Sequence, residues 1–463
     1  MTQAPNMTDL SVDAPQIHAS YTREDVAAQL KEHDIRFLRL VFTDIMGMNK
    51  NVEVPQSQFD KALDGQIMFD GSSIQGFVRI EESDMLLAPD YDTFRIYPWD
   101  NLGRGKVARI ICDVQNPDGS IFPGCPRSNY KRVAAKSKEI GAVLMAGPEA
   151  EFFMFERDKD GGLTTLTNDE AGYFDAAPID QAEGCRHVIT NDLQAMGIEV
   201  EASHHEVAPG QHEIDFRYGN GLQTADNLIT FKNVVRRVAK DFDLHATFMP
   251  KPIFGINGSG MHIHLSLFDL EGSENLFADT NTDWKISPNG LSFIAGIIEH
   301  SRALCAITNP LVNSFKRLVP GYEAPTHVAW SMRNRSPMIR IPDRRGLGTR
   351  MELRMPDPSC NPYLAFACVL AAGLDGIERK LEPPPPVNKN IYTMSARERS
   401  RNKVGTLPGN LSEAVIALEK DQLVQEALGE HIAAHFIDAK KREWAEYIAQ
   451  VHEWELQRYL GTF

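Results

Sequence analysis

The sequence predicts an α+β fold in which a small N-terminal domain is followed by a larger second domain. First, 463 residues exceed the size at which a single hydrophobic core stops growing. Second, strand-like segments carry polar residues on one face, and third, helical stretches separate these segments. We expect a flexible tail at residues 1–20, a mostly β domain at 21–120 and the second domain at 121–463.

The N-terminal domain is predicted from its first helix and two apolar strands. The segment 21–26 opens a helix, because Thr22 suits the N-cap position and Asp25, three residues later, completes a capping-box pattern. Residues 37–42 and 107–114 are apolar and β-branched enough to form strands. A loop-rich section at 69–73 lies between them.

The second domain begins with a helix at 126–138. Its expected strands are 145–155, 204–216, 261–268, 338–342 and 349–355, and its main helices are 224–242 and 289–306. This order predicts an antiparallel or mixed sheet with one face on helices and one lining a site. Four prolines at 383–386 form a rigid break, and 411–460 are helical. There a 3.6-residue apolar stripe comprises Ala433, Phe436, Ile437, Trp444, Tyr447, Ile448 and Val451.

The composition excludes several classes of protein. A formal net charge of −15 argues against nucleic acid or an anionic membrane surface as the main partner. The six cysteines are scattered without a CxxC pair, so reduced thiols are expected rather than disulfides or a zinc-thiolate site. Residues 1–20 show no secretory signal, and the apolar run near 363–374 is too short to span a bilayer. We therefore expect a cytoplasmic protein.

Glu149 and Glu151 are the most informative pair in the chain. They lie in the apolar segment 145–155, and alternation along a strand places both side chains on one face. Two carboxylates on an apolar face repel each other and are costly to bury without a positive partner. A hard divalent cation, which takes carboxylate oxygens as ligands, is the simplest such partner.

Further acidic and imidazole side chains lie on the other predicted strands. Glu206 and Glu213 are seven residues apart across a Pro-Gly turn, so a hairpin could direct both into one cavity. His262 and His264 share one strand face, and Glu352 lies on a later strand. Each residue alone has an ordinary explanation in solvent or core. Together, five glutamates and two histidines predict two oxygen-rich sites for Mg²⁺ or Mn²⁺ rather than zinc.

Basic side chains supply the second half of the predicted site. The segment 316–325 is a loop by its Pro and Gly content, and seven arginines follow between 333 and 354. Arginine forks match carboxylate and phosphate, although an exposed basic face is an alternative. Ile339 and Ile341 favour the first interpretation because they place Arg340 on a half-buried strand. Two metals, an arginine cluster and a mobile loop indicate phosphoryl transfer without a P-loop.

Six motifs in order then resemble one family, class I glutamine synthetase, over about residues 21–463. They are FDGSS at 69–73, GPEAEFF at 147–153, HHEV at 204–207, NGSGMH at 257–262, RLVPGYEAP at 317–325 and NRS at 334–336. The resemblance implies a β-grasp-like N-terminal domain and a catalytic domain with an antiparallel sheet flanked by helices. It implies ATP-dependent ligation of ammonia to L-glutamate through γ-glutamyl phosphate, which gives L-glutamine, ADP and phosphate.

The resemblance also assigns site residues. The first metal would take Glu151, Glu206 and Glu213, and the second, nearer the nucleotide phosphates, would take Glu149, His262 and Glu352. The substrate-binding positions would be Asn257, Gly258, Arg317, Glu323 and Arg354. The ATP-binding positions would be Phe216, His264, Arg335, Arg340 and Arg350. The catalytic residues would be Asp70, which takes a proton from ammonium, Glu323, which shields the acyl phosphate, and Arg335, which neutralises the γ-phosphoryl group.

The family's assembly is a homo-dodecamer of two hexameric rings with each active site between neighbouring subunits. Asp70 would then complete a neighbour's site, and the C-terminal helix would join the rings. GFVRIEES at 76–83 and NIYTMS at 390–395 resemble the α-type bacterial subgroup. The context of Tyr392 differs from that of an adenylylated tyrosine, whereas Arg79 and Glu443 match feedback positions. A nitrogen-regulatory transcription factor is a possible partner.

Three other functions remain open at this stage. A γ-glutamyl ligase for a polyamine or another amine would share the fold, but such relatives depart from the pattern around the flap and ammonium site. A non-catalytic metabolite-sensing regulator would have lost metal ligands. A metal-dependent amide hydrolase would use the carboxylates, but gives no reason for the flap and arginines.

Overall fold

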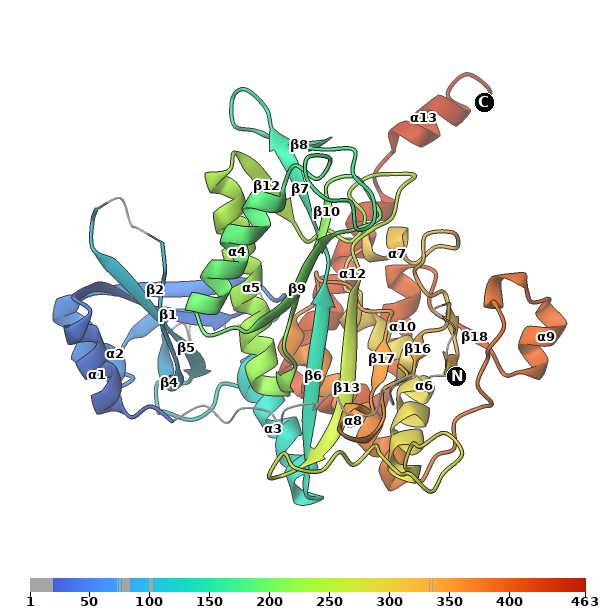
Figure 1. Cartoon of the computed structure of the whole chain (residues 1–463), viewed down its shortest axis with the longest axis horizontal. Coiled ribbons are helices and arrows are strands. Elements are labelled where there is room, and N and C mark those ends of the chain that lie inside the picture. Colours follow the sequence, from blue (N-terminus) through green and yellow to red (C-terminus); the bar gives the residue numbers. More distant parts are fainter. Residues whose placement is uncertain are drawn as a thin grey trace, which may run out of the picture.

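The computed structural model describes residues 20–72, 74, 76, 84–99, 103–332, 334 and 336–463. Nearly all of the predicted tail at 1–20 therefore lies outside the described residues. The predicted α+β class is confirmed, with a small N-terminal sheet beside a larger body of sheets and helices (Figure 1).

The N-terminal sheet has the strand order β2-β1-β5-β4-β3. β1 and β5 pair in parallel, and the other neighbours are antiparallel. The capping box predicted for Thr22 and Asp25 is present at the first helix. The elements are α1 (Arg23–Glu32), β1 (Ile35–Thr43), β2 (Asn49–Pro55), η1 (Gln56–Gln58), α2 (Phe59–Leu63), β3 (Met68–Asp70), β4 (Asp84–Ile96) and β5 (Lys106–Gln115).

The first half of the larger body supplies most of its strands. Its elements are α3 (Pro126–Glu139), β6 (Ala142–Ala150), β7 (Phe152–Arg157), β8 (Leu163–Thr167), α4 (Glu183–Ala195), β9 (Val200–His205), β10 (Gln211–Phe216), β11 (Gly219–Asn220), α5 (Gly221–Asp241), β12 (Leu244–Thr247) and β13 (Met261–Asp269). One sheet runs β11-β6-β13-β17-β16-β15, and a second runs β12-β7-β10-β9 with β8 on β7.

The second half is mainly helical. Its elements are α6 (Pro288–Thr308), α7 (Ser314–Arg317), β14 (His327–Val328), β15 (Trp330–Ser331), β16 (Ile339–Arg340), η3 (Gly346–Gly348), β17 (Met351–Leu353), α8 (Pro362–Glu378), η4 (Ile391–Thr393), α9 (Ala396–Arg401), β18 (Gly405–Thr406), α10 (Leu411–Lys420), α11 (Gln422–Leu428), α12 (Glu430–Ile448) and α13 (Glu453–Tyr459). The four prolines lie between α8 and η4, outside any helix or strand, as expected.

The predicted continuous strand at 145–155 is wrong. The chain forms β6 up to Ala150 and β7 from Phe152, and these two strands belong to different sheets. Glu151 lies at the break, where its amide donates to the carbonyl of Gly260 at 3.1 Å. Glu149 therefore lies near the end of one sheet's strand, and Glu151 lies at the point where the chain passes into the next sheet. Apolar composition alone does not reveal such a break, because both strands are buried.

Helices α6 and α8 pack in the core of the larger body. α6 is long and apolar enough to cross a membrane by length and composition, but 72% of that window is buried inside the protein. It packs on α8 and α10, so its composition reflects burial in the core. All six cysteines are free and buried, as the sequence predicts.

A buried arginine joins the two sheet systems. Arg127 on α3 pairs with Asp226 on α5 at 2.8 Å and with Asp90 on β4 at 2.7 Å, and it reaches Asp113 on β5 at 3.3 Å. Tyr363 on α8 donates its hydroxyl to Asp226 at 2.6 Å. The N-terminal sheet is thus fixed to the helices of the larger body by a network of paired charges.

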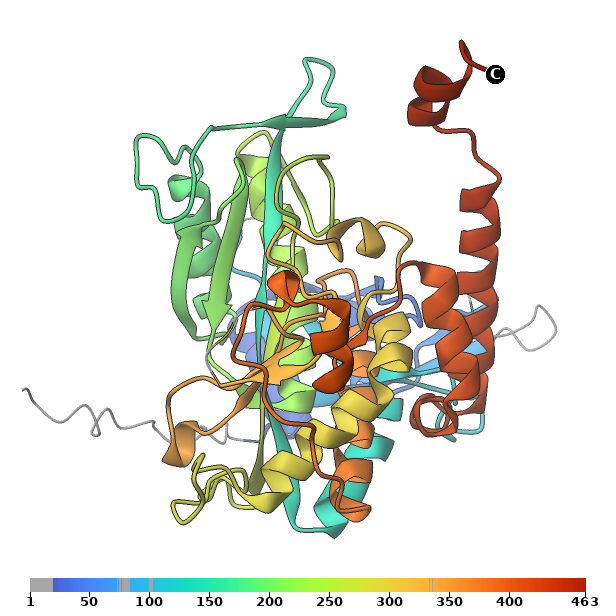
Figure 2. The same cartoon turned by 90° about the vertical axis from the view of Figure 1, so that its right-hand side faces the viewer.

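The C-terminal helices leave the body of the molecule. α12 packs on α10 and α11 through Ile432, Ala433 and Phe436, which are buried. Beyond them the predicted apolar stripe continues into solvent, because Ile448 and Val451 are exposed. Figures 1 and 2 show α13 standing clear of the rest of the chain.

Candidate active site

The first cluster of metal-ligand side chains comprises Glu149, His262 and Glu352. One ligand atom from each lies within 4.8 Å of the others. The residues come from β6, β13 and β17, which are neighbours in the sheet, and strand register sets His262 opposite Glu149. Nδ1 of His262 is 3.4 Å from a carboxylate oxygen of Glu149 and 3.6 Å from one of Glu352.

His264 and Arg350 extend this cluster. As predicted, His264 shares a strand face with His262, and its Nε2 donates to Glu149 at 2.7 Å. Arg350 donates from Nε to the other ring nitrogen, Nδ1, at 3.1 Å. Burial alone would raise the pKa of Glu149, but hydrogen bonds from His262 and His264 outweigh it and hold that pKa far below the ordinary value. Glu149 is therefore an anion with donors already in place.

The second cluster comprises His204, Glu206 and Glu213, with ligand atoms again within 4.8 Å of one another. They lie on the β9–β10 hairpin that the sequence predicts, and Glu213 is opposite His204 in its register. Nε2 of His204 is 3.2 Å from Glu213, and Nδ1 is 3.6 Å from Glu206. Gly210 forms the turn at φ 67°, where a Cβ atom would lie 2.9 Å from the carbonyl oxygen of Met154.

Glu151 faces the second cluster from the break between β6 and β7. Its carboxylate accepts from the amide of Gly260 at 2.9 Å and from Nε2 of Gln211 at 2.8 Å. Burial and the negative charge of Glu206 raise the pKa of Glu151 to about 8. Burial likewise raises the pKa of Glu206 to about 7, with the charge of Glu323 adding to the effect.

The second cluster fits a cation because its carboxylates are crowded together in a largely buried position. Burial and the nearby charges of Asp215 and Glu151 also raise the pKa of Glu213 well above its ordinary value. Crowded carboxylates without a positive partner retain protons, and a bound divalent cation would release them. An oxygen-rich set with one imidazole suits Mg²⁺ or Mn²⁺.

The arginines lie beside the first cluster. Arg340 and Arg354 both donate to the carboxylate of Glu352, which is 1% exposed. Burial alone would raise the pKa of Glu352, but the charges of Arg354 and His262 outweigh burial and hold that pKa below its ordinary value. This carboxylate is therefore ionised. Arg317 is buried and donates to the main-chain carbonyls of Met355 at 2.8 Å and Pro356 at 3.1 Å. Its guanidinium thus braces the segment that follows β17.

The predicted flap loop carries Glu323 toward the second cluster. Glu323 has a positive φ of 60° and an exposed side chain, and its charge acts on Glu206. Two neighbours hold the loop. Lys251 places its ammonium 3.7 Å from the ring centroid of Tyr322, and the Tyr392 hydroxyl donates to the carbonyl of Ala324 at 2.6 Å. The flap is therefore tethered on both sides of Glu323.

The remaining predicted residues have different surroundings. The ring of Phe216 is buried against Phe231, so it does not face an open surface. Gly258 accepts from Gln211 at 3.2 Å, and Asn257 precedes it in the loop before β13. Asp70 ends β3 with an exposed carboxylate that accepts from the amide of Ser72 at 2.8 Å.

Of the two residues predicted for feedback, only Glu443 is described. Glu443 on α12 accepts from the amide of Val312 at 3.0 Å and from Lys440 at 2.8 Å. Arg79 lies outside the described residues, as does Arg335, predicted for phosphate neutralisation.

A third group with ligand-type side chains comprises Asp169, His205 and His212, all buried, with His205 on β9 and His212 on β10. Arg186 donates to Nδ1 of His212 at 3.0 Å, so Nε2 of that ring carries the proton and offers no lone pair. Asp169 already accepts from His205 at 3.1 Å and from the amide of Gly210 at 3.0 Å. This group is a hydrogen-bond network that fixes the turn between Glu206 and Glu213.

Four site residues were missed by sequence reasoning: His204, Gln211, Lys251 and Tyr392. His204 could have been found, because alternation along β9 places it two residues before Glu206 on the same hairpin. The other three act through contacts with residues 60 or more positions away, for which a single sequence gives no signal.

Two family models match the chain. The model for "Glutamine synthetase, beta-Grasp domain" matches residues 34–117, and that for "Glutamine synthetase, catalytic domain" matches residues 123–459. The chain belongs to the glutamine synthetase family. The resemblance drawn from the six motifs is thereby confirmed.

Curated relatives agree over nearly the whole chain. A glutamine synthetase of Thermus thermophilus is 61% identical over 446 residues, which cover 96% of this chain and 100% of the relative. One from Clostridium saccharobutylicum is 54% identical over 445 residues, with the same coverage. The enzyme is accordingly a glutamate–ammonia ligase that forms glutamine from glutamate and ammonia with ATP and divalent metal ions.

Solved structures share the fold. One described as "GmaS/ADP complex-Conformation 1" has a TM-score of 0.86 and 34% identity, covering 94% of this chain and 99% of its own. The cryo-EM structure of Plasmodium falciparum glutamine synthetase has a TM-score of 0.84 and 25% identity, and the match covers 95% of this chain and 99% of that structure's chain.

Proposed function

We propose that the two clusters are the two cation sites of glutamine synthesis. At one, Glu151 joins Glu206 and Glu213 of the second cluster as a ligand, and at the other the ligands are Glu149, His262 and Glu352. The observation that carries this proposal is that Glu149, near the end of β6, belongs to the first cluster, whereas Glu151, in the β6–β7 break, faces the second. The cations would supply positive charge beside the phosphoryl oxygens.

The arginines and the flap have distinct proposed roles. Arg340, Arg350 and Arg354 line the first cluster and provide fixed positive charge for a phosphorylated ligand and the glutamate carboxylate. Glu323 on the tethered flap binds ammonium and excludes water from the acyl phosphate. Asp70, from a neighbouring subunit, takes the proton, and Asn257, Gly258, Arg317 and Arg335 complete the substrate and phosphate contacts. His264 and Phe216 belong to the nucleotide side, Phe216 through its main chain.

The identity of the amine acceptor is tested by phosphate release. The enzyme is incubated with ATP, Mg²⁺ and glutamate, and with ammonium, ethanolamine or putrescine as acceptor. We expect ammonium to be the preferred acceptor. Release with the two amines and none with ammonium would instead assign a γ-glutamyl ligase for other amines, and no release with any acceptor would favour the regulator.

The role of the flap is tested by Glu323→Ala. We expect ATP to bind with near-normal affinity, because no nucleotide contact is assigned to this exposed side chain. Glutamine formation should fall by about 100-fold or more, since water would reach the acyl phosphate and ammonium would lose its anionic contact. Glutamine formation at the wild-type rate would contradict this role. Glu382→Ala, outside the flap, is the control.

Assembly, location and regulation also belong to the proposal. We infer a dodecamer of two hexameric rings, supported by exposed apolar side chains on the projecting C-terminal segment. A cytoplasmic location is supported by the six free cysteines. The domain boundary near 120 is supported by the gap between the two family matches. Feedback through Arg79 and Glu443, and a nitrogen-regulatory transcription factor as partner, stay predictions.

A further inference from the structure

A cavity of about 370 Å³ lies between the N-terminal sheet and the helices of the catalytic domain, apart from both metal clusters. Its walls come from the β1–β2 connection at 45–49, one face of α5, the end of β12, the loops at 310–311 and 358–361, and α12. None of the described residues that line it is an aspartate or glutamate. A volume of this size is in the range of sites for small organic molecules.

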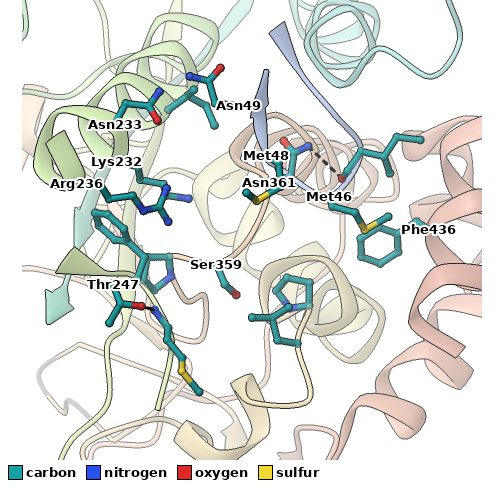
Figure 3. Close-up of a pocket in the computed structure, with 18 of the residues that line it drawn as sticks. Met46, Met48, Asn49, Lys232, Asn233, Arg236, Thr247, Ser359, Asn361 and Phe436 are labelled. Atoms are coloured by element: carbon teal, nitrogen blue, oxygen red, sulfur yellow. Dashed lines mark hydrogen bonds between the residues drawn. The ribbon is translucent and has the colours of Figure 1, made fainter. Parts of the chain in front are cut away.

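Two cations of α5 extend into this cavity. Figure 3 shows Lys232 and Arg236 side by side, one helical turn apart, pointing toward its centre. Lys232 is 7% exposed, and the hydrogen bond found for its ammonium runs 3.3 Å to the carbonyl of Cys360. An ammonium has three donors, so two lack a partner among the described residues. Burial lowers the pKa of Lys232 to about 8.

Arg236 lies at the mouth of the cavity, where it is exposed and stacks 5.2 Å from the ring centroid of Phe248. Within the described part of the chain, neither Lys232 nor Arg236 forms an ion pair. This is unusual in a protein with a net charge of −15, where carboxylates outnumber basic groups. In contrast, Lys440 on the opposite wall is paired with Glu443 at 2.8 Å.

The rest of the lining defines the other features of a ligand. Asn233 offers an amide group near the two cations, whereas Met46, Phe248 and Phe436 form apolar walls. The charge of Asp357 acts on Lys232, but no described carboxylate forms an ion pair with it. A buried ammonium without a paired anion is costly, and an anion held by Lys232 and Arg236 would offset that cost. Free phosphate would satisfy the cations but would leave the apolar walls in water.

We propose that this cavity is a second ligand site of the enzyme, which binds a small organic anion through Lys232 and Arg236 and buries its apolar body against the opposite wall. The site joins the β1–β2 connection to α5 and α12, so its ligand contacts both domains. The carboxylate or phosphate head group is the shared chemistry, and the apolar body distinguishes this ligand from a free inorganic ion.

The test uses hexanoate as probe on the assembled enzyme, saturated with ADP, Mg²⁺ and glutamate so that the catalytic site is filled. Titration calorimetry should show saturable binding of one hexanoate per subunit. Hexanol and inorganic phosphate, which carry only one of the two features, should bind at least about tenfold more weakly. Lys232→Met and Arg236→Met should each weaken hexanoate binding by about tenfold or more, as expected for a lost charge-assisted hydrogen bond.

Lys240→Met is the matched control, because Lys240 is an exposed lysine of α5 outside the cavity. It should bind hexanoate as the wild type does. Lys232→Met replaces a buried ammonium by an apolar chain of similar length, so it should unfold at the wild-type temperature or above. No saturable binding by the wild type, equal binding by Lys232→Met, or phosphate binding tighter than hexanoate would each overturn the proposal.

Discussion

Glu149 and Glu151 show how two carboxylates two positions apart acquire opposite properties. Glu149 receives hydrogen bonds from His262 and His264, and its pKa is far below the ordinary value. Glu151 has two donors, but burial and the charge of Glu206 raise its pKa. The difference arises from the neighbours that each side chain meets across the β6–β7 break. The negative charge of the first cluster, which contains Glu149, is therefore partly neutralised by protein groups. The second cluster, which Glu151 faces, depends on a cation.

Glu213→Gln tests that dependence. Because the pKa of Glu213 is raised in the folded protein, its contribution to stability is fully present below about pH 4.3, where the carboxyl is protonated. That contribution is lost as pH rises through the pKa of the folded state. At pH 7.5 without metal, the variant should thus be more stable than the wild type by about 1–3 kcal/mol. Its stabilisation by Mn²⁺ should largely vanish, and glutamine formation should fall at least about 100-fold.

The measurement is thermal unfolding with EDTA and with Mn²⁺, together with a glutamine assay. Glu199→Gln is the control, because Glu199 pairs with Arg217 at the exposed start of the same hairpin. A variant that keeps the full Mn²⁺ shift would remove Glu213 from the metal site.

At the scale of elements, two core helices of the larger body approach very closely. α6 and α8 meet at Gly296 and Gly376, where a Cβ atom on Gly376 would lie 2.0 Å from the carbonyl oxygen of Ser292. His300 on α6 adds polar links, with Nε2 3.1 Å from Asp375 on α8 and Nδ1 2.7 Å from Asp421 at the cap of α11. Both ring nitrogens face carboxylates, so the geometry suits the imidazolium.

Gly376→Ala should force the two helices apart. Alanine gains about 1 kcal/mol in helix propensity over glycine, but overpacking against a backbone oxygen costs about 1–3 kcal/mol or more. We expect a lower free energy of unfolding and a lower Tm in denaturant and thermal scans. Gly184→Ala on α4, where a Cβ atom meets its nearest neighbour at 3.9 Å, should be neutral or stabilising. Equal stability of the two variants would contradict the close-packing argument.

His300→Gln should reveal a pH-dependent contribution to stability. Burial lowers the pKa of His300, but hydrogen bonds to Asp421 and Asp375 outweigh it and raise that pKa above 6.5. The stabilisation is therefore fully present below about pH 6.5 and is lost as pH rises through the folded value. The substitution should lower the free energy of unfolding by about 1–2 kcal/mol at pH 6, and this difference should become smaller above pH 8. A loss that is independent of pH, or one matched by His187→Gln on α4, would exclude the imidazolium.

At the scale of the whole molecule, a buried charge network holds the two domains together, and a C-terminal arm, residues 450–463, projects from the body. Arg127 ties β4 and β5 to α5, so the N-terminal sheet is held in place beside the catalytic body. The arm is different, because its apolar side chains lack a core of their own. Trp454, Leu456, Tyr459 and Leu460 are all exposed. A row of exposed apolar side chains marks a surface for another chain.

Deletion of residues 450–463 tests the arm at this scale. The body should keep its secondary structure, because α13 contains no buried residue. In the proposed dodecamer the apolar arm binds the second ring, so without it the assembly should fall to smaller oligomers in light scattering. A deletion variant that forms the same oligomer as the wild type would contradict this role of the arm. Deletion of residues 1–19, which lie outside the described residues, is the control.

Local features followed directly from the sequence, because neighbouring residues encode them. The Thr22–Asp25 capping box, the hairpin that carries Glu206 and Glu213, and the shared face of His262 and His264 depend on spacings of a few residues. The residue types also indicated hard cations and an anionic ligand, since carboxylate and guanidinium chemistry does not depend on the fold.

The sequence by itself thus determined the α+β class, the ligand chemistry of the site and, through six motifs, the family. Only the tertiary structure decided that the chain breaks at Glu151 and that Glu149 is held by His264 while Glu151 is held by Gln211. It also decided that Lys232 faces a cavity with no acid among its described lining residues. The physical reason is distance along the chain. Periodicity and turn chemistry act over a few residues, whereas these partners are separated by 60 or more positions and meet only when sheets and helices pack.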